Sequence, residues 1–556
     1  MRIIFEEYQY EAPILNENLD AEYYTNVGAG KAKTTFVGYY YSQRLNDSVF
    51  ILPKVFVQKN TIFGHTLEDV VCIESANVDD KDKNLLFNLS VWIYLAIKRF
   101  AANNEKTGIT NQEYIQNVIS NGDTNFATYL DIVLQLIRFH RENSQLLAFT
   151  TMMSKKHNDH TCWTKTINRR LPFLQNGAPI YMDAICKTKE LDLDEELIVL
   201  FYSVLRYLQQ KFCFRLSFEL NYNLFPTSKI ANLIENGGGK AMLKRIRHKY
   251  FKDVFVQLWN ILYAFFDKAN KIESSTSKPD VLIAKDFNII FEAMVDQLVS
   301  DTEVVYLKNQ KDGKIVDHIF KYKSIVSGIE SDEVFYILDS KYYKDDNIIG
   351  ENSIYKQFTY ARNIIYEFRK QYRDEITEGY DITPNFFIRG YVATKENEYV
   401  FDELKLEYTK NEYLSNHFEN RLFDRDTLMA LEYKANLLYI LVSYVQDHQE
   451  SGIKEKFRKQ FQKVVAEHYN FYYIDFKSND ELERFVEQNF KKINGKIMRY
   501  PKNNGLRLYL AEEKAKDCSG GECSIKYGRF FYSKKLINAN SSKKNGSSSY
   551  DSLNHS

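Results

Sequence analysis

The stretch YILDSKYYK, residues 336–344, places an aspartate and a lysine two residues apart in a run that otherwise has the composition of a buried strand. Alternate residues of a strand point to the same face, so the side chains of Asp339 and Lys341 are predicted to lie side by side. A carboxylate and an ammonium in apolar surroundings are costly unless they pair or bind a metal ion. The two residues therefore form either a structural ion pair or part of a catalytic site.

A second carboxylate is predicted to approach this pair from a neighbouring strand. The polar segment SGIES, residues 327–331, separates two strand-like runs and indicates a β-hairpin. With a turn near residue 329, Asp317 falls opposite Asp339 to Lys341. Two aspartates can hold a hard cation such as Mg²⁺, which polarises a phosphodiester and activates a bound water. The lysine can orient that water and stabilise the charge that develops on phosphate.

The surrounding residues predict the elements that would position these side chains. Hydrophobic spacing indicates a helix, three strand-like runs, a second helix and a last strand, in the order α-β-β-β-α-β. These elements are expected over residues 287–300, near 303–308, and over 315–325, 334–343, 351–371 and 385–393. A hairpin flanked by helices favours a catalytic site over an isolated ion pair.

The rest of the chain predicts an α/β multidomain protein. A β-hairpin is expected over residues 34–59 and a polar module with a loop at NGAP over 163–183. Helices are expected over 83–102, 111–120, 126–140, 194–212, 254–269, 424–447 and 452–468. The predicted domains are a β-rich N-terminal region (1–110), a mainly helical middle region (111–272), a domain holding the candidate site (280–400), a mixed C-terminal extension (401–538) and a disordered tail (539–556).

Composition and motifs exclude several classes of function. The 556 residues contain 74 basic and 74 acidic side chains, so any contact with nucleic acid must be local. The glycine-containing stretches TNVGAGKAKTT and IENGGGKAM lack the spacing of a phosphate loop, so we expect no nucleotide hydrolysis by this chain alone. The apolar run 85–100 is shorter than a membrane span, and residues 1–13 do not have the pattern of a signal peptide. We therefore expect a cytoplasmic protein without membrane contact.

The element order around Asp317, Asp339 and Lys341 resembles the PD-(D/E)xK nuclease core. The region is more closely similar to the LlaJI-type restriction endonuclease subunit, a relative of McrC. The segments that carry this resemblance are FVGYYYS, FILPKVF, WTKTINRRLPFLQNGAPIY, FEAMVDQLV, DGKIVDHIF, YILDSKYYK and ENSIYKQFTYARNI. The fold class implied is a PD-(D/E)xK core preceded by a β-hairpin-containing N-terminal region and a helical middle region.

The resemblance implies a role for each site residue. Asp317 would be the first metal-binding aspartate, Asp339 the second acid and Lys341 the lysine of the motif. Glu292, on the helix before the sheet, would complete the metal site, and Gln357 would lie close to the site from the following helix.

The chain departs from the family pattern in two places. Val316 stands where the proline that gives the motif its name usually lies. A literal Pro279-Asp280 precedes the helix and cannot pair in the hairpin, so we exclude it. Asp296 lies one turn from Glu292 on the same helix face, so either acid could complete the metal site.

The resemblance also implies cofactor, partners and location. The expected cofactor is Mg²⁺, for which Mn²⁺ can substitute. The expected partners are double-stranded DNA and a McrB-like AAA+ GTPase that contacts the N-terminal half, with dimerisation for double-strand cutting, in the bacterial cytoplasm. The alternatives are a stand-alone repair or recombination nuclease and a non-enzymatic adaptor. Basic segments at 491–502 and 526–536 are further candidates for phosphate contact.

Overall fold

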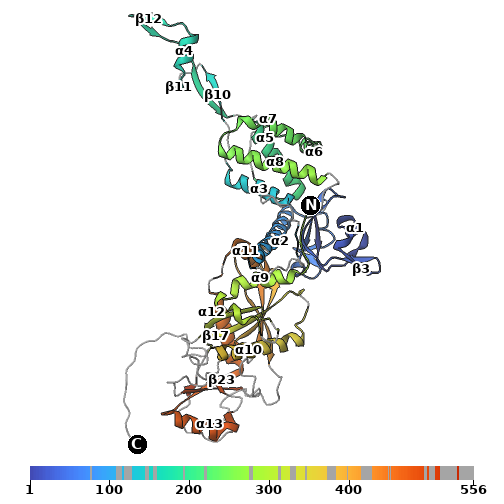
Figure 1. Ribbon diagram of the computed structural model, residues 1–556, viewed down its shortest axis with the longest axis vertical. Helices are drawn as coiled ribbons and strands as arrows, with labels where there is room; N and C mark the ends of the chain where they lie inside the picture. The colour runs from blue at the N-terminus through green and yellow to red at the C-terminus, as the bar shows by residue number, and fades with distance from the viewer. Residues whose placement is uncertain are drawn as a thin grey trace. The chain divides into compact units, whose positions relative to one another are not determined.

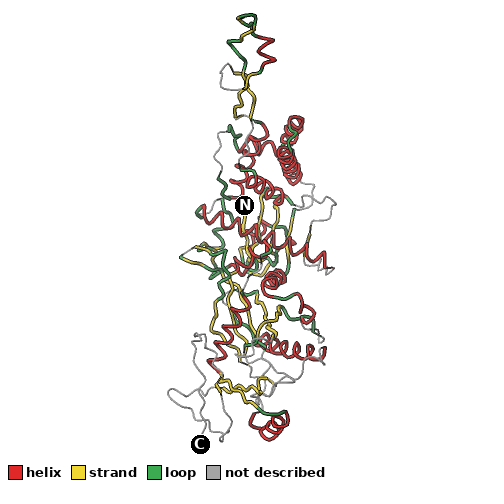
Figure 2. Tube along the Cα trace, turned by 90° about the vertical axis from the view of Figure 1, so that its left-hand side faces the viewer, coloured by secondary structure: helices red, strands yellow, loops and turns green. Residues whose placement is uncertain are grey.

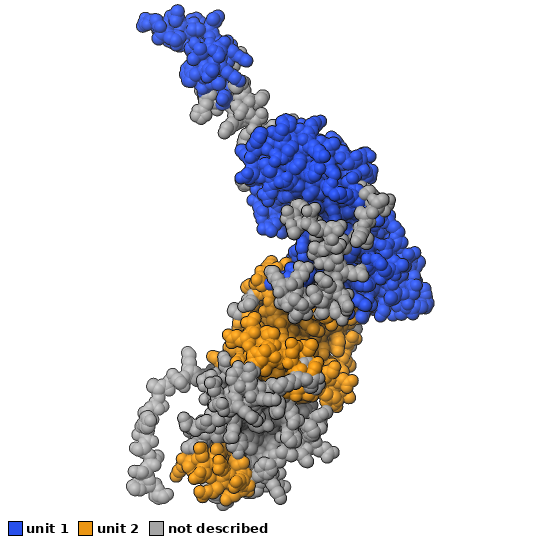
Figure 3. Space-filling view, viewed as in Figure 1, with its two compact units in different colours: residues 1–53, 60–286 blue, residues 54–59, 287–556 orange. Residues whose placement is uncertain are grey.

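The computed structural model divides the chain into two compact units, which are described separately (Figure 3). Unit 1 comprises residues 1–53 and 60–286, and unit 2 comprises residues 54–59 and 287–556. The structure describes all residues except 75–77, 108–114, 118–127, 145–148, 155–159, 192–194, 218–221, 274–279, 311–312, 314, 326–332, 345–346, 372–382, 397, 415–428, 449, 451, 494–496, 500–506, 514–534 and 537–556. Both units combine helices with sheets, which confirms the predicted α/β class (Figures 1 and 2).

Unit 1 is built on a five-stranded sheet. Its strands are β1 (Arg2–Phe5), β5 (Val37–Ser42), β6 (Asp47–Leu52), β9 (Ile115–Asn117) and β15 (Val281–Ala284), in the order β1-β6-β5-β15-β9. The antiparallel pair β5 and β6 confirms the hairpin predicted over residues 34–59. Gly38 is required here, because a Cβ at this position would lie 2.3 Å from the carbonyl oxygen of Leu282 on β15.

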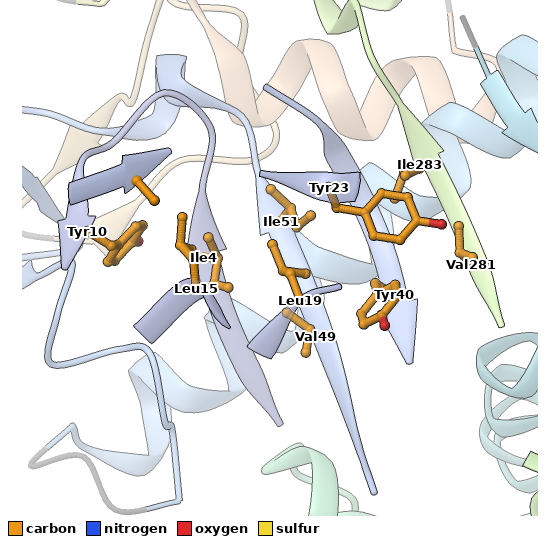
Figure 4. Close-up of a cluster of buried hydrophobic side chains, with 11 residues drawn as sticks. Ile4, Tyr10, Leu15, Leu19, Tyr23, Tyr40, Val49, Ile51, Val281 and Ile283 are labelled. Carbon is orange, nitrogen blue, oxygen red and sulfur yellow. The ribbon is translucent and has the colours of Figure 1, made fainter. Parts of the chain in front are cut away.

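Small elements near the N-terminus cover this sheet with apolar side chains. They are β2 (Tyr10–Glu11), α1 (Ala12–Asn18), η1 (Ala21–Tyr23), β3 (Thr25–Gly28), β4 (Lys31–Lys33), β7 (Thr61–Ile62) and β8 (His65–Thr66). Figure 4 shows Tyr10, Leu15, Leu19 and Tyr23 packed with side chains of β1, β5, β6 and β15. The buried cluster joins residues far apart in sequence and forms the core of this part of unit 1.

The helix predicted over residues 83–102 is confirmed but is longer. It is α2 (Asp80–Thr107), with 28 residues. By length and composition its segment Asp80–Asn103 could cross a membrane, the one such helix among the described residues. The expectation that it is too short to span was therefore wrong. The same helix packs against β5, β6 and β15, as a core helix of a sheet does, so its length is weak evidence for a membrane span.

A group of helices packs around α8 in unit 1 (Figure 1). Its members are α3 (Tyr129–Glu142), α5 (Glu196–Phe212), α6 (Thr227–Glu235), α7 (Gly238–Ile246), the 3-10 turn η3 (Arg247–Lys249) and α8 (Asp253–Glu273). The helices predicted over 126–140, 194–212 and 254–269 are confirmed in the described residues. The helix predicted over 111–120 is wrong at Ile115–Asn117, which pair with β15 as β9.

The polar module predicted over residues 163–183 contains a short helix and a hairpin. Its elements and the sheet from which they extend are β10 (Phe149–Ser154), β11 (His160–Thr161), α4 (Trp163–Arg169), β12 (Phe173–Gln175), β13 (Ala178–Ile180) and β14 (Cys186–Leu191). Asn176 and Gly177 have φ values of 52° and 79° and form the tight turn predicted at NGAP. Large apolar side chains of this module are exposed: Trp163, Ile167, Leu171, Phe173, Leu174, Ile180 and Met182.

Unit 2 is built on a mixed five-stranded sheet. Its strands are β16 (His318–Lys323), β17 (Glu333–Lys341), β18 (Asn385–Tyr391), β21 (Glu407–Leu414) and β22 (Met429–Asn436), in the order β16-β17-β18-β22-β21. The three central strands β17, β18 and β22 are parallel, and the two outer strands are antiparallel to their neighbours.

One strand prediction and one helix prediction in unit 2 were wrong. The strand expected near 303–308 is a 3-10 helix, η4 (Thr302–Leu307), whose buried residues Val304 and Leu307 are three apart rather than two. The observed order is therefore α-η-β-β-α-β. The helix expected over 424–447 is β22 followed by α11 (Leu437–Gln446). A central parallel strand is buried on both faces and lacks the alternation that identifies strands.

Helices cover both faces of this sheet. They are α9 (Phe287–Val299), α10 (Glu351–Gln371) and α12 (Ile453–His468), which confirm the predictions for 287–300, 351–371 and 452–468. On one face, Phe457 and Phe461 of α12 pack on Phe386 of β18 at ring distances of 4.9 and 5.4 Å. On the other, η4 and α10 enclose Ile319 and Ile337.

A segment from the N-terminal part of the sequence also belongs to unit 2. It contains η2 (Lys54–Phe56), where Val55, Phe56 and Val57 are buried. The Lys54 Nζ lies 5.0 Å from the ring centre of Tyr342, directly after β17.

The remaining elements of unit 2 lie near the C-terminus or in short hairpins. They are β19 (Thr394–Lys395), β20 (Glu398–Tyr399), β23 (Tyr469–Asp475), α13 (Asn479–Ile493), β24 (Ile497–Arg499), β25 (Arg507–Glu513) and β26 (Lys535–Leu536). Most of the basic segments 491–502 and 526–536, and the predicted tail 539–556, lie outside the described residues.

Candidate active site

Strand β17 presents Asp339 and Lys341 on the same face of the unit 2 sheet, as predicted. The Lys341 Nζ lies 2.5 Å from Asp339 Oδ2, and Asp339 is 8% exposed. The preceding residues on this face, Phe335 and Ile337, are buried in the apolar cluster with η4 and α10. The charged pair therefore stands at the carboxyl end of an apolar strand face, where few waters can screen it.

Asp317 lies beside Asp339, as the hairpin predicted. In the antiparallel pair of β16 and β17, His318 is opposite Leu338, so the next step of the register brings Asp317 opposite Asp339. The backbone N–H of Ser340 donates a hydrogen bond to Asp317 Oδ2 at 3.1 Å. This bond fixes the second carboxylate next to the first.

The carboxylates disfavour one another's charge. Burial raises the pKa of Asp317 well above its usual range, and the charges of Asp339 and then Glu292 raise it further, while Lys341 lowers it. Burial also raises the pKa of Glu292, and the charge of Asp339 adds to this effect. The single positive charge of Lys341 does not balance the charges of three ionised carboxylates. A divalent cation bound beside them would do so.

The structure distinguishes between Glu292 and Asp296, which the sequence left open. Asp296 accepts hydrogen bonds from Ser300, Lys308 and His318, the last at 3.1 Å. Burial would raise the pKa of Asp296, but the hydrogen bond with His318 and the charge of Lys308 outweigh it and lower the pKa to about 2. Its Oδ1 is therefore engaged by three structural partners, whereas the charges of Asp339 and Lys341 act on Glu292.

Asp296 also positions the first aspartate through Lys308. The Lys308 Nζ donates to the Asp296 side chain and, at 2.8 Å, to the backbone oxygen of Asp317. His318, the next residue, has its imidazole buried and bonded to the same carboxylate. The sequence analysis missed Lys308 and His318, although the histidine next to Asp317 in IVDHIF was a usable signal.

We expect Asp296→Asn to destabilise the protein and Glu292→Gln not to do so. The lowered pKa of Asp296 contributes about 1–2 kcal/mol of stability after allowance for its partial exposure. This contribution is present above pH about 4, the ordinary value for aspartate, and is lost as the pH falls towards 2. Thermal unfolding of wild type and both variants at pH 7 measures the difference. Equal losses of Tm in the two variants would contradict the separate roles.

The hydrogen bonds of Gln357 within the described residues go to β18 and not to the carboxylates. Its side chain is buried, and its Nε2 donates to the backbone oxygen of Phe386 on β18 at 3.4 Å, while Asn385 Nδ2 donates to the Gln357 backbone oxygen at 3.1 Å. Phe387, the next residue of β18, is opposite Asp339 in the parallel register. Gln357 therefore contacts the strand next to the site.

A buried ion pair lies on the same face of the sheet as Asp339 and Lys341, on the next two strands. It was not predicted from the sequence. Arg389 of β18 is opposite Lys341, and its Nη1 lies 3.1 Å from Glu432 Oε1 on β22. Glu432 also accepts from Asn411 at 2.8 Å and Tyr413 at 2.7 Å. Arg389 Nη2 donates to the backbone oxygen of Lys344 at 3.0 Å, which ties the segment after Lys341 to the sheet.

The two departures from the family pattern have clear positions in the structure. Val316 is fully buried in the cluster with Ile319 and Ile337, so an apolar residue fills the place of the proline. Asp280 lies in unit 1, where it pairs with Lys268 at 2.9 Å and accepts from the backbone N–H of Tyr129. The Asp280 carboxylate therefore has structural partners within unit 1.

The pair Asp317 and Asp339 fits a magnesium ion better than a site of three protein ligands. Among the described residues, no three His, Cys, Asp or Glu side chains are grouped as ligands of one ion in their present conformations. Mg²⁺ usually binds through one or two carboxylates and keeps several waters. The Oδ2 of Asp339 is buried and has no hydrogen-bond donor with good geometry, although Lys341 lies against it. Two adjacent, mutually repelling carboxylates are a suitable donor set.

Comparisons with known proteins identify related sequences and structures. A model of the LlaJI restriction endonuclease family matches residues 50–417, about two thirds of the chain. No curated protein is significantly similar in sequence. A half-complex from the tetradecameric assembly of Thermococcus gammatolerans McrB AAA+ hexamers with bound McrC matches at 13% identity and a TM-score of 0.26, over 84% of this chain and 99% of the other. The McrBC complex of the same organism matches at 14% identity and a TM-score of 0.18, over 54% and 88% of the two chains. At these TM-scores we base no argument on the structural matches.

Proposed function

Because this chain belongs to the LlaJI restriction endonuclease family, we propose that it is the Mg²⁺-dependent DNA endonuclease subunit of a LlaJI/McrBC-like restriction system. The observation that carries the proposal is the hydrogen bond from Ser340 to Asp317, which holds two buried carboxylates together beside Lys341. We assign this site to the PD-(D/E)xK class on the basis of these residues.

The residues of the site have separate roles in the proposed reaction. Asp317 and Asp339 would hold Mg²⁺, and Glu292 would join them directly or through a water. The bound ion would supply Lewis-acid stabilisation of the phosphodiester and a water of lowered pKa. Lys341, held at 2.5 Å from Asp339, would donate hydrogen bonds to the attacking water and to the phosphate oxygen. The ion pair with Asp339 would hold this ammonium beside the bound ion.

An AAA+ GTPase partner is part of the proposal. The sequence contains no phosphate-loop motif, so GTP hydrolysis would come from another protein. The exposed apolar side chains of the module with α4, β12 and β13 form a surface of the kind that contacts proteins rather than water.

Cleavage of circular plasmid by the purified full chain tests the proposal. Wild type and Asp339→Ala are each incubated with Mg²⁺ or EDTA, and with or without the McrB-like AAA+ partner protein and GTP. We expect cutting by wild type only, and only with Mg²⁺ and the partner. Cutting without the partner would instead favour a stand-alone nuclease. Equal inactivity of wild type and a folded Asp339→Ala in every mixture would contradict the catalytic role and favour an adaptor.

A further inference from the structure

A basic surface of unit 1 lies where α7 turns into α8. The sequence from Asn236 to Lys252 contains no acidic residue. Its last part, residues 244–252, is named here the basic turn. It carries five lysines and arginines and one histidine: Lys244, Arg245, Arg247, His248, Lys249 and Lys252. In a chain whose net charge is zero, this concentration of positive charge is a local feature.

The basic turn is held rigidly by Trp259 of α8. The indole Nε1 donates to the backbone oxygen of Leu243 at 2.8 Å, which satisfies a carbonyl in the last turn of α7. The guanidinium of Arg247 lies 5.3 Å from the same ring, and its Nη1 donates to the backbone oxygen of Tyr250 at 3.0 Å. Arg247 therefore has a structural role, and the other cations of the basic turn are the candidates for binding a ligand.

The remaining cations are exposed and have fewer carboxylate partners than positive charges. Arg245 and Lys249 share one carboxylate, Glu196, each at 3.3 Å, and their side chains are 71% and 47% exposed. Lys244 and Lys252 are exposed and make no ion pair within the part of the chain that the structure describes. The carboxylates beside these four cations are the shared Glu196 and the exposed Asp253, which follows Lys252. Positive charge is therefore in excess and attracts a polyanion.

Phe251 adds an apolar contact in the middle of these charges. Its side chain is 86% exposed, between Lys249 and Lys252, whereas the preceding Tyr250 is buried and bonded to Glu195. An exposed aromatic ring beside lysines suits a ligand that offers both phosphates and flat apolar groups, as nucleic acid does.

We propose that the basic turn binds the phosphate backbone of duplex DNA, with Lys244 and Lys252 on phosphates and Phe251 against the sugars and base edges. This inference rests on the proposed function in that DNA is the substrate. It adds a DNA contact in unit 1 that is separate from the carboxylate site of unit 2. Phosphate contacts fix the position of a protein on the duplex and carry no sequence preference themselves.

Fluorescence anisotropy with a labelled duplex of about 30 base pairs tests this proposal, since a site of that length offers many phosphates to one protein. All proteins are full chains carrying Asp339→Asn, so that cleavage does not interfere. We expect Lys244→Glu/Lys252→Glu to weaken binding at least about tenfold near 0.1 M salt and to reduce the salt slope by about two. Phe251→Ala should weaken binding without changing the slope. Lys31→Glu/Lys33→Glu, with the same charge change on β4, is the matched control and should bind like the parent.

Each outcome decides the proposal. Equal binding by the basic-turn variant and the control would overturn it, as would a parent that fails to bind the duplex at low salt. Unchanged DNA binding, together with loss of partner-dependent cleavage when the same lysine substitutions are made in the chain that keeps Asp339, would assign the basic turn to the AAA+ protein instead. If the basic-turn variant loses DNA binding and the wild-type chain does not cleave DNA in any mixture, the DNA interface is supported and the proposed nuclease activity is contradicted.

Discussion

Asp339→Asn is expected to reduce partner-dependent DNA cleavage about a thousandfold or more, because loss of a metal-holding carboxylate removes several kcal/mol of transition-state stabilisation. The substitution keeps the shape of the side chain and removes only its charge. Plasmid cleavage at saturating Mg²⁺, GTP and partner measures the effect. Asp317→Asn should cause a loss of similar size, because the two oxygens act on the same ion.

Thermal stability distinguishes this role from a structural one. Asp317 has a pKa raised by burial, Asp339 and Glu292, so the folded carboxyl holds its proton more tightly than the unfolded one. Stability without metal then falls as the pH rises from about 4 through the raised pKa. Asp317→Asn should therefore equal or exceed wild type in Tm at pH 7 without metal. Wild type should gain Tm on addition of Mg²⁺, and the variant should not.

The opposite thermal result would contradict the catalytic interpretation. If Asp339 served only as the structural partner of Lys341, Asp339→Asn would leave a buried ammonium without its counter-charge. Breaking such a pair costs about 3–5 kcal/mol. A large loss of Tm together with no response of wild type to Mg²⁺ would thus identify a structural ion pair.

Arg389→Met is expected to give the largest loss of stability in unit 2, about 3–5 kcal/mol, because Glu432 would stay buried without its guanidinium partner. Burial would raise the pKa of Glu432, but hydrogen bonds from Tyr413, Asn411 and Arg389 outweigh it and lower the pKa. The stabilisation from Glu432 is therefore present above pH about 4.5 and is lost on acidification. Chemical denaturation at pH 7 of wild type and the variant measures the loss.

A double-mutant cycle supplies the control for this prediction. Arg389→Met/Glu432→Met removes both charges and should cost less than the sum of the single variants. Arg138→Met, which breaks an exposed pair with Glu142 at 2.8 Å, should destabilise the protein far less than Arg389→Met does. If the destabilisation of the double variant equals the sum of the two single variants, Arg389 stabilises the protein through its bond to Lys344 rather than through Glu432.

Much of the candidate site was predictable from the sequence because its determinants are local. The alternation of β17 places Asp339 and Lys341 on one face, and a short hairpin connection fixes the register that brings Asp317 to them. Both features follow from residues within about 25 positions of one another. The helices α9 and α10 were predictable from their spacing of apolar residues.

The remaining features depend on contacts between distant residues. Glu292 and Asp296 look equivalent on one helix face, and only Lys308 and His318, brought there by folding, separate their roles. Arg389 and Glu432 lie in apolar runs on β18 and β22, where the charges signal a buried pair but not their partners. The central strand β22 has no alternation, so the pattern alone favoured a helix.

The placement of residues 54–59 in unit 2 makes this unit discontinuous in sequence. During synthesis, this segment leaves the ribosome well before Asp317 and Asp339, so unit 2 becomes complete only when the later chain packs on Val55, Phe56 and Val57. A fragment that starts at Phe287 would lack these side chains and the cation over Tyr342. Unit 2 cannot therefore be transplanted as one contiguous piece, and an exchange of this unit between relatives must carry the N-terminal segment with it.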